Sequence, residues 1–174
     1  LKRALVWLND RGERREFTFA EISELSKKAA NYLSSLGLKK GDRVLTLLKR
    51  NWQYWVTAVA CHRMGVVIIP ASVQLATKDI VYRAIIATDD EWSQGQVEEA
   101  AKQCTGLDYL LLARGGKEGW LDYDRGIAEA PAEFNMPEIY NTDILLSYFT
   151  SGTTGMPKLV VHDQTYPLGH IVTA

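Results

Sequence analysis

The chain has 174 residues, of which 47% are hydrophobic and 24% are charged, and its formal net charge is −1. These proportions are ordinary for a globular protein, and a chain of this length can bury about 70% of the surface that it exposes when unfolded. The near-neutral charge argues against nucleic acid or an acidic membrane as a partner, because proteins that bind these usually carry a clear basic excess.

The apolar runs and the cysteines indicate the cellular compartment of the protein. The longest apolar run, residues 66–69 with its neighbours, is far too short to span a bilayer. Cys61 lies in an apolar helical stretch, and with Cys104 as the only other cysteine there is no disulfide framework. We therefore expect a reducing compartment, the cytoplasm or, in a eukaryote, the mitochondrial matrix. Because residue 1 is leucine, we expect the natural start to lie upstream.

The first 37 residues predict a hairpin followed by a helix. Two strands, 4–8 and 15–19, are joined by the turn cluster 9–12. Thr18 and Glu21 have the spacing of a capping box, and Gly37 suits the position after a helix end. The intervening apolar residues recur at helical spacing, which predicts a helix of about 16 residues. These are Ile22, Leu25, Ala29, Leu33 and Leu36.

The next segment predicts a strand–helix–strand unit. Residues 43–48 form an apolar strand, Asn51 is the expected N-cap of a helix, and Gly65 ends that helix. Residues 66–69 form a second apolar strand. Two apolar strands separated by a helix predict a right-handed crossover in a parallel sheet that is covered on both faces.

The middle of the chain predicts two further helices, 77–87 and 96–103, and a strand at 109–113. The glycine-bearing loop 114–119 could be a phosphate site, and Asp122 and Asp124 could be paired metal ligands. A plain surface turn, and carboxylates that are solvated or cap a helix, are commoner explanations, and we favour these.

The most informative stretch is the loop at residues 150–158. An apolar run, 144–149, precedes it and the β-branched segment 159–161 follows it, which predicts strand–loop–strand. Its glycines let backbone N–H groups approach an anion, and its lysine adds a compact positive charge. The spacing is not that of a Walker A motif. A hairpin turn without a ligand is the alternative. The candidate binding residues are Thr150, Ser151, Gly152, Thr153, Thr154, Gly155 and Lys158.

This loop closely resembles the signature of the adenylate-forming superfamily, which includes acyl-CoA synthetases, luciferases and adenylation domains of peptide synthetases. Residues 40–44 (KGDRV) and 64–71 (MGVVIIPA) resemble landmarks of the same N-terminal region. Residues 4–7 (ALVW) and 162–164 (HDQ) are most similar to the medium-chain acyl-CoA synthetases. Leu159 departs from the pattern, because the wider superfamily usually has glycine there.

The resemblance implies an α/β fold, the N-terminal part of the large AMP-binding domain, in which a parallel sheet is covered by helices. Residues 1–174 would be a fragment of that domain, with the small C-terminal domain absent. It further implies that a carboxylate attacks the α-phosphate of ATP, giving an acyl-adenylate and pyrophosphate, and that coenzyme A then displaces AMP. The seven loop residues would bind the phosphates, and Mg²⁺ would arrive with the nucleotide. No residue is assigned to catalysis.

The resemblance also leaves questions open. The adenine, ribose and catalytic-lysine motifs would lie beyond Ala174, so the carboxylate is unspecified and we expect this chain alone to be inactive. An adenylation domain for an amino or aryl acid, and a non-catalytic nucleotide-binding scaffold, are the alternatives.

We interpret His162 as structural, because an ionised carboxylate needs no base. We also expect a further strand between the two middle helices, so that either the chain is shortened around 88–93 or residues are missing there.

Overall fold

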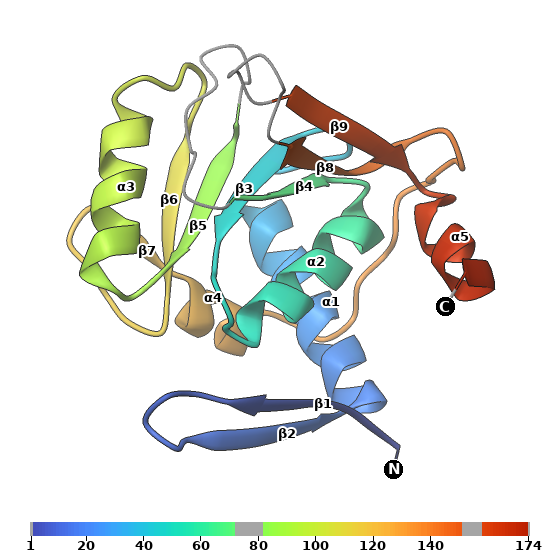
Figure 1. Cartoon of the computed structure of the whole chain (residues 1–174), viewed down its shortest axis with the longest axis horizontal. Helices are drawn as coiled ribbons and strands as arrows, with labels where there is room; N and C mark the ends of the chain where they lie inside the picture. Colours follow the sequence, from blue (N-terminus) through green and yellow to red (C-terminus); the bar gives the residue numbers. More distant parts are fainter. Residues whose placement is uncertain (1, 72–81, 151–157, 174) are drawn as a thin grey trace.

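The computed structural model describes residues 2–71, 82–150 and 158–173 (Figure 1). Its strands are β1 (Arg3–Leu8), β2 (Arg14–Thr18), β3 (Arg43–Leu47), β4 (Val67–Pro70), β5 (Ala84–Thr88), β6 (Tyr109–Ala113), β7 (Leu121–Asp122), β8 (Ile144–Thr150) and β9 (Lys158–Asp163). Its helices are α1 (Phe19–Ser35), α2 (Gln53–Met64), α3 (Glu91–Ala101), α4 (Tyr123–Glu129) and α5 (Tyr166–Thr173).

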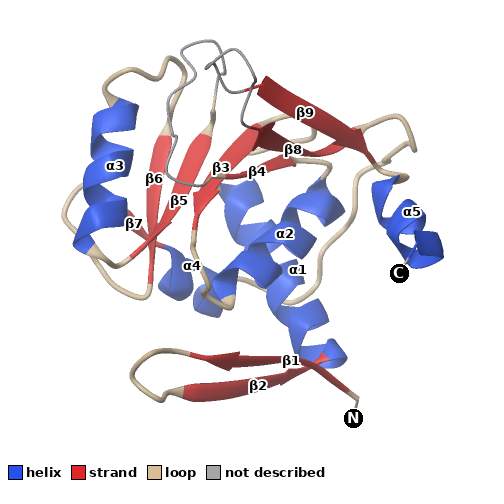
Figure 2. Ribbon diagram, in the orientation of Figure 1, coloured by secondary structure: helices blue, strands red, loops and turns tan. Residues whose placement is uncertain are grey.

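The central sheet has the strand order β7-β6-β5-β3-β4-β8-β9. Every neighbouring pair in it is parallel except β8 and β9, which form an antiparallel hairpin. The hairpin β1–β2 is a separate two-stranded sheet that lies at the far end of α1 (Figure 2). The predicted α/β fold with a mostly parallel sheet covered by helices is confirmed.

Alternating residues of the strands divide the core between the two faces of the sheet. Val44, Ile68 and Ile86 belong to a buried cluster that also contains residues of α1, α2 and α4. Leu45 and Ile85 belong to a second buried cluster, which includes residues of α3. Because side chains of a strand point alternately to opposite faces, α1, α2 and α4 cover one face and α3 covers the other. The strands buried on both faces explain the continuous apolar runs in the sequence.

The predicted ends of the first two helices are largely confirmed. The Thr18 side chain accepts a hydrogen bond from the Glu21 backbone N–H, and the Glu21 carboxylate accepts one from the Thr18 N–H, which completes the capping box. Gly37 has φ +86° after α1, and Gly65 has φ +68° at the end of α2. These are left-handed conformations that glycine adopts without a Cβ clash.

The predicted helix over 77–87 is wrong for its described part. Residues 84–88 form β5, which is fully buried and pairs in parallel with both β3 and β6. Residues 77–81 lie outside the described part of the chain. The run of alanine and isoleucine fits either a buried strand or a buried helix, and periodicity alone does not separate them.

The strand expected between the two middle helices is present within the segment predicted as a helix, and the expectation that the chain is shortened or incomplete around 88–93 stays a prediction. The extra strand is β5, and α3 begins shortly after it, at Glu91, where Asp90 accepts a hydrogen bond from the Ser93 N–H. Asn51 is also not the N-cap of α2, because the cap position is Trp52 and no side chain caps the helix. The Asn51 side-chain amide donates instead to the Thr88 hydroxyl at 2.7 Å. It ties the end of β3 to the end of β5.

Replacing Thr18 with alanine should destabilise the protein by about 1 kcal/mol, because α1 loses its N-cap. Thermal and urea unfolding would measure this, with Thr18→Ser as a control that keeps the hydroxyl. Hydrogen bonds from Thr18 lower the pKa of Glu21 below its ordinary value of 4.5. The difference in the free energy of unfolding between Thr18→Ala and the wild type should therefore be largest above pH 4.5. It should shrink as the pH falls through the lowered pKa of Glu21. Identical unfolding curves would contradict the capping role.

Candidate functional site

The candidate loop is closed by the hairpin of β8 and β9. Thr150, the last residue of β8, lies opposite Lys158, the first residue of β9. The Thr150 hydroxyl donates to the Lys158 carbonyl oxygen at 3.3 Å. The predicted strand–loop–strand arrangement is confirmed, and the two ends of the loop are brought together by a paired register.

The remaining candidate residues, Ser151, Gly152, Thr153, Thr154 and Gly155, lie outside the described residues. Their role as phosphate ligands therefore stays a prediction. The point at which the loop leaves the sheet is defined by β8, which runs parallel to β4 with Leu146 beside Ile68. The loop thus leaves the sheet at the carboxyl end of a parallel strand, the edge at which open α/β sheets bind their ligands.

The two described candidates are exposed to solvent, and Lys158 carries an unpaired charge. No carboxylate of the described residues lies within 4.0 Å of the Lys158 ammonium group, whereas Lys49 pairs with Asp90 at 2.7 Å. An ammonium group without an acidic partner at the end of the loop is suited to an anionic ligand.

A layer of apolar side chains supports the hairpin directly beneath these residues. Phe149 and Leu159 are opposite one another, half-buried, and packed against the second core cluster. This contact explains the departure at position 159, where the wider superfamily usually has glycine. A leucine fits because its side chain packs against the face of the sheet that carries Leu45 and Ile69.

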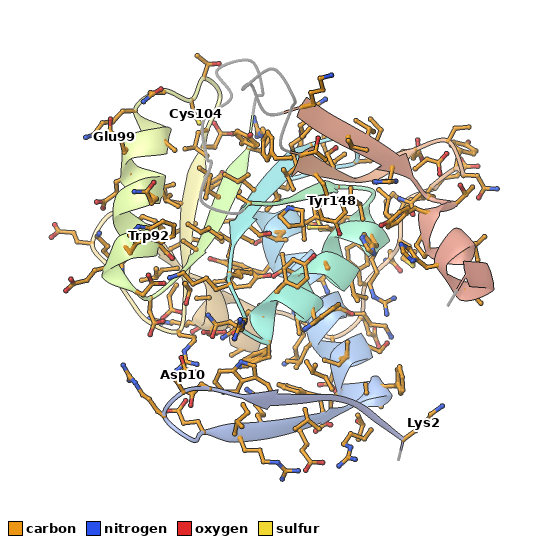
Figure 3. The ribbon with its side chains drawn as sticks, in the orientation of Figure 1. Lys2, Asp10, Trp92, Glu99, Cys104 and Tyr148 are labelled. Carbon is orange, nitrogen blue, oxygen red and sulfur yellow. The ribbon has the colours of Figure 1, made fainter. Side chains whose placement is uncertain are left out.

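Aromatic side chains support the other face of the hairpin. Tyr148, labelled in Figure 3, packs against the first core cluster, as does Tyr54 of α2. Burial, with a smaller contribution from Tyr148, raises the pKa of Tyr54 to about 12. The ring of His162 lies between Tyr148 and Tyr166, with centroid distances of 6.1 and 4.0 Å. His162 therefore packs where β9 leads into α5, as expected for a structural histidine.

Two other buried groups are ionisable but have no role in the loop. Burial lowers the pKa of His62 to about 4, so its ring is neutral at physiological pH. Burial also raises the pKa of the Cys61 thiol to about 12, which makes it unreactive and confirms the expectation of a buried, unpaired cysteine.

Asp122 and Asp124, the possible metal ligands, are explained by local structure. Asp122 caps α4 by accepting from the Arg125 N–H at 2.9 Å. Asp124 accepts from the buried side chain of Gln53 at 3.1 and 3.2 Å and from the Arg114 backbone N–H at 2.6 Å. Within the described ranges no group of three or more His, Cys, Asp or Glu residues could hold a metal ion. The two aspartates thus have structural partners.

The sequence did not reveal the contacts that position the loop. The Tyr54–Tyr148 pair joins α2 to β8, and the Gln53–Asp124 pair joins α2 to α4. These residues are far apart in the sequence and belong to no motif. The only available signal was the alternation in β8, which places Tyr148 and Phe149 on opposite faces.

Comparison with known proteins gives the family. The model of a family described as "AMP-binding enzyme" matches residues 2–173. The chain belongs to this family. It is 37% identical to the mitochondrial acyl-coenzyme A synthetase ACSM4 of Rattus norvegicus over 93% of the chain, and 37% identical to the mitochondrial acyl-coenzyme A synthetase ACSM5 of Homo sapiens over 98%. It spans only 29% and 31% of the lengths of these two relatives.

Two solved structures share the fold of this chain. An anthranilate CoA ligase, AuaEII, solved in complex with anthranoyl-AMP, has a TM-score of 0.78 at 20% identity, over 96% of this chain and 33% of its own. An acyl-CoA synthetase of Brucella canis has a TM-score of 0.75 at 22% identity, over 92% and 30%. In the described part of the present chain, no helix has the length and hydropathy of a membrane span.

Replacing Leu159 with alanine should destabilise the hairpin by about 1–2 kcal/mol, less than for a fully buried leucine, because the side chain is half-buried. The matched control is Val161→Ala on the same strand, where the side chain is 51% exposed and the change should stay within about 0.5 kcal/mol. Urea unfolding of both variants would measure the difference. Equal losses would show that Leu159 does not support the hairpin.

Proposed function

We propose that the chain is the N-terminal part of the AMP-binding domain of an AMP-forming acyl-CoA synthetase, and that residues 150–158 bind the polyphosphate of ATP. The observation that carries the proposal is the ammonium group of Lys158, which has no acidic partner among the described residues and lies beside Thr150, at the end of a loop that leaves the carboxyl edge of the sheet. Family membership and the acyl-CoA synthetase relatives support the same assignment. A small C-terminal domain would follow this part in the longer protein.

The chemistry of the first step explains why such a loop is needed. A carboxylate attacks the α-phosphorus of ATP, an acyl-adenylate forms, and pyrophosphate leaves. Charge accumulates on the leaving pyrophosphate as the P–O bond breaks, and fixed donors at its oxygens stabilise that charge. Lys158 would neutralise the β- and γ-phosphates, while the hydroxyls of Thr150, Ser151, Thr153 and Thr154 would donate hydrogen bonds. Gly152 and Gly155 would permit close backbone approach.

Lys158 fits a polyphosphate because it offers a cation without an acidic partner among the described residues. The Thr150 hydroxyl, which donates to the Lys158 carbonyl in this structure, would turn towards the phosphates to donate to them. Mg²⁺ would enter with the nucleotide, held largely by phosphate oxygens and water. In the second step, coenzyme A displaces AMP to form the thioester. We propose the cytoplasm as the location, or the mitochondrial matrix by analogy with the mitochondrial relatives.

Two other functions remain as alternatives. An adenylation domain for an amino or aryl acid would use the same loop, and a panel of fatty, aryl and amino acids in a pyrophosphate-release assay of the longer protein would separate these substrates. A non-catalytic nucleotide-binding scaffold is the second alternative. A stop codon directly after Ala174 in the gene would favour the scaffold, whereas an adenine motif and a catalytic lysine further on would favour the ligase.

In the longer protein, Lys158→Ala should weaken the use of ATP about 10- to 100-fold in kcat/KM, since a charge-assisted hydrogen bond of about 1.5–3 kcal/mol is lost. Pyrophosphate release at varied ATP would measure it. Lys158→Arg should retain part of the activity. Lys102→Ala, which removes an exposed lysine paired with Glu99, is the control that should change nothing. Wild-type kinetics in Lys158→Ala would exclude the residue from the site.

The chain of 174 residues alone should release no pyrophosphate from ATP and a carboxylic acid, because the groups that bind adenine and ribose would lie in the remainder of the protein. A sensitive coupled assay with the purified chain, beside the longer protein as a positive control, tests this. Release of pyrophosphate by the purified chain, lost in its Lys158→Ala variant, would contradict this prediction, because the 174 residues would then be sufficient for adenylation.

A further inference from the structure

Two segments that the proposed site does not use, residues 40–44 and 64–71, meet at the amino edge of the central sheet. The Gly41 N–H donates to the Gly65 carbonyl oxygen at 2.9 Å. Gly41 shortly precedes β3 and Gly65 shortly precedes β4, and these two strands pair in parallel. The two segments therefore form one structural unit at the edge opposite the candidate loop.

The side chain of Lys40 lies across Gly65. A Cβ atom at position 65 would be 2.9 Å from the Cγ atom of Lys40, which is closer than a Cβ atom normally approaches a neighbour, and 3.5 Å from Cγ1 of Ile139. Gly65 also has φ +68°, a conformation that favours glycine. The absence of a side chain at position 65 thus lets the aliphatic stem of Lys40 pass over the end of α2.

This path brings the Lys40 ammonium group to the start of β8. The connector 130–143 leads from α4 to that strand (Figure 1). The ammonium group lies 2.6 Å from the Asp143 carboxylate and donates to the Glu138 carbonyl oxygen at 3.0 Å. Asp143 also accepts from the Tyr140 N–H at 2.7 Å. The residue directly before β8 is therefore held by a charge-assisted pair.

The Lys40–Asp143 pair is mostly buried, unlike an ordinary surface pair. The side chains of Lys40 and Asp143 are 33% and 24% exposed, whereas those of Lys102 and Glu99 are 70% and 63% exposed. Exposed pairs contribute little, because water screens them and ordering their side chains costs entropy. Loss of one partner of a buried pair leaves the other charge without compensation. The start of β8 thus depends on both residues.

β8 has little backbone pairing to hold it against the rest of the parallel sheet. Among the described residues, β8 and β4 share one register pair, Ile68 with Leu146, whereas β3 and β4 share four. The other neighbour of β8 is β9, the last strand of the sheet. Because ladder hydrogen bonds fix one strand relative to the next, so short a ladder leaves the position of the hairpin to side-chain contacts.

We propose that Lys40 is a positioning residue for the phosphate-binding loop. It acts through Asp143, which fixes the start of β8, and so through the strand that ends at Thr150 beside Lys158. This inference rests on the proposed function of the loop. Binding groups must be held within about 0.5 Å of the productive geometry, and a displacement of about 1 Å by a distant substitution can cost about 100-fold in rate.

Hydrogen exchange of the longer protein without nucleotide tests the structural step. Lys40→Met keeps the aliphatic stem over Gly65 and removes the ammonium group. The amides of β8 should exchange about tenfold faster in this variant, because a charge-assisted hydrogen bond is lost, whereas those of β5 should keep their wild-type rates. Lys40→Arg keeps the charge and should restore part of the protection. Lys39→Met, at the exposed neighbouring lysine, is the matched control and should change neither strand.

Kinetics of the same variants test the link to ATP. Lys40→Met and Asp143→Asn should each lower kcat/KM for ATP about tenfold. The double variant should lose no more than either alone, because both changes remove one contact. In a Lys158→Ala background, Lys40→Met should cost about threefold at most, since much of its influence passes through Lys158. A role in overall stability alone would give equal losses in both backgrounds. Thermal unfolding of each variant confirms that the fold is kept.

Four results would overturn the proposal. Wild-type exchange of β8 in folded Lys40→Met would show that the pair does not hold the strand. Faster exchange with wild-type ATP kinetics would show that its effect does not reach the loop, and the ATP site would stand if Lys158→Ala is still impaired. Equal losses from Lys40→Met in both backgrounds would assign Lys40 to stability. Wild-type kinetics in Lys158→Ala would remove the ATP site, and this proposal with it.

Discussion

The pairing of Thr150 with Lys158 is the constraint on which the candidate site depends. Both residues end strands of one hairpin, and the hydrogen bond from the Thr150 hydroxyl to the Lys158 carbonyl closes the loop at its base. The register holds because the next pair inward, Phe149 and Leu159, packs against the core. A chain that can bury those two side chains therefore delivers the loop and its lysine at the carboxyl edge of the sheet.

The hairpin is also fixed from its other face, where Tyr148 meets α2 through Tyr54. Strands and helices that contribute no ligand therefore position the loop. In the proposed function this support would have an electrostatic purpose, since a cation and hydroxyls that are held in place would stabilise a developing phosphate charge without reorganisation.

The sequence predicted features whose cause is local. The Thr18–Glu21 capping box and the glycine at the end of α2 are examples, because cap and glycine preferences act within one turn. Residues 84–88 were predicted incorrectly, because the choice between strand and helix depended on pairing with β3 and β6. Asn51 was likewise expected to cap α2, whereas its partner is Thr88 on β5. Long-range pairing decides such cases, and one sequence does not display it.

The most direct test of the central claim is a crystal structure of the longer protein with a non-hydrolysable ATP analogue and Mg²⁺. We predict that the β- and γ-phosphates lie within hydrogen-bond distance of the Lys158 ammonium group and the Thr150 hydroxyl. Terminal phosphates bound elsewhere, with residues 150–158 facing bulk solvent, would contradict the account.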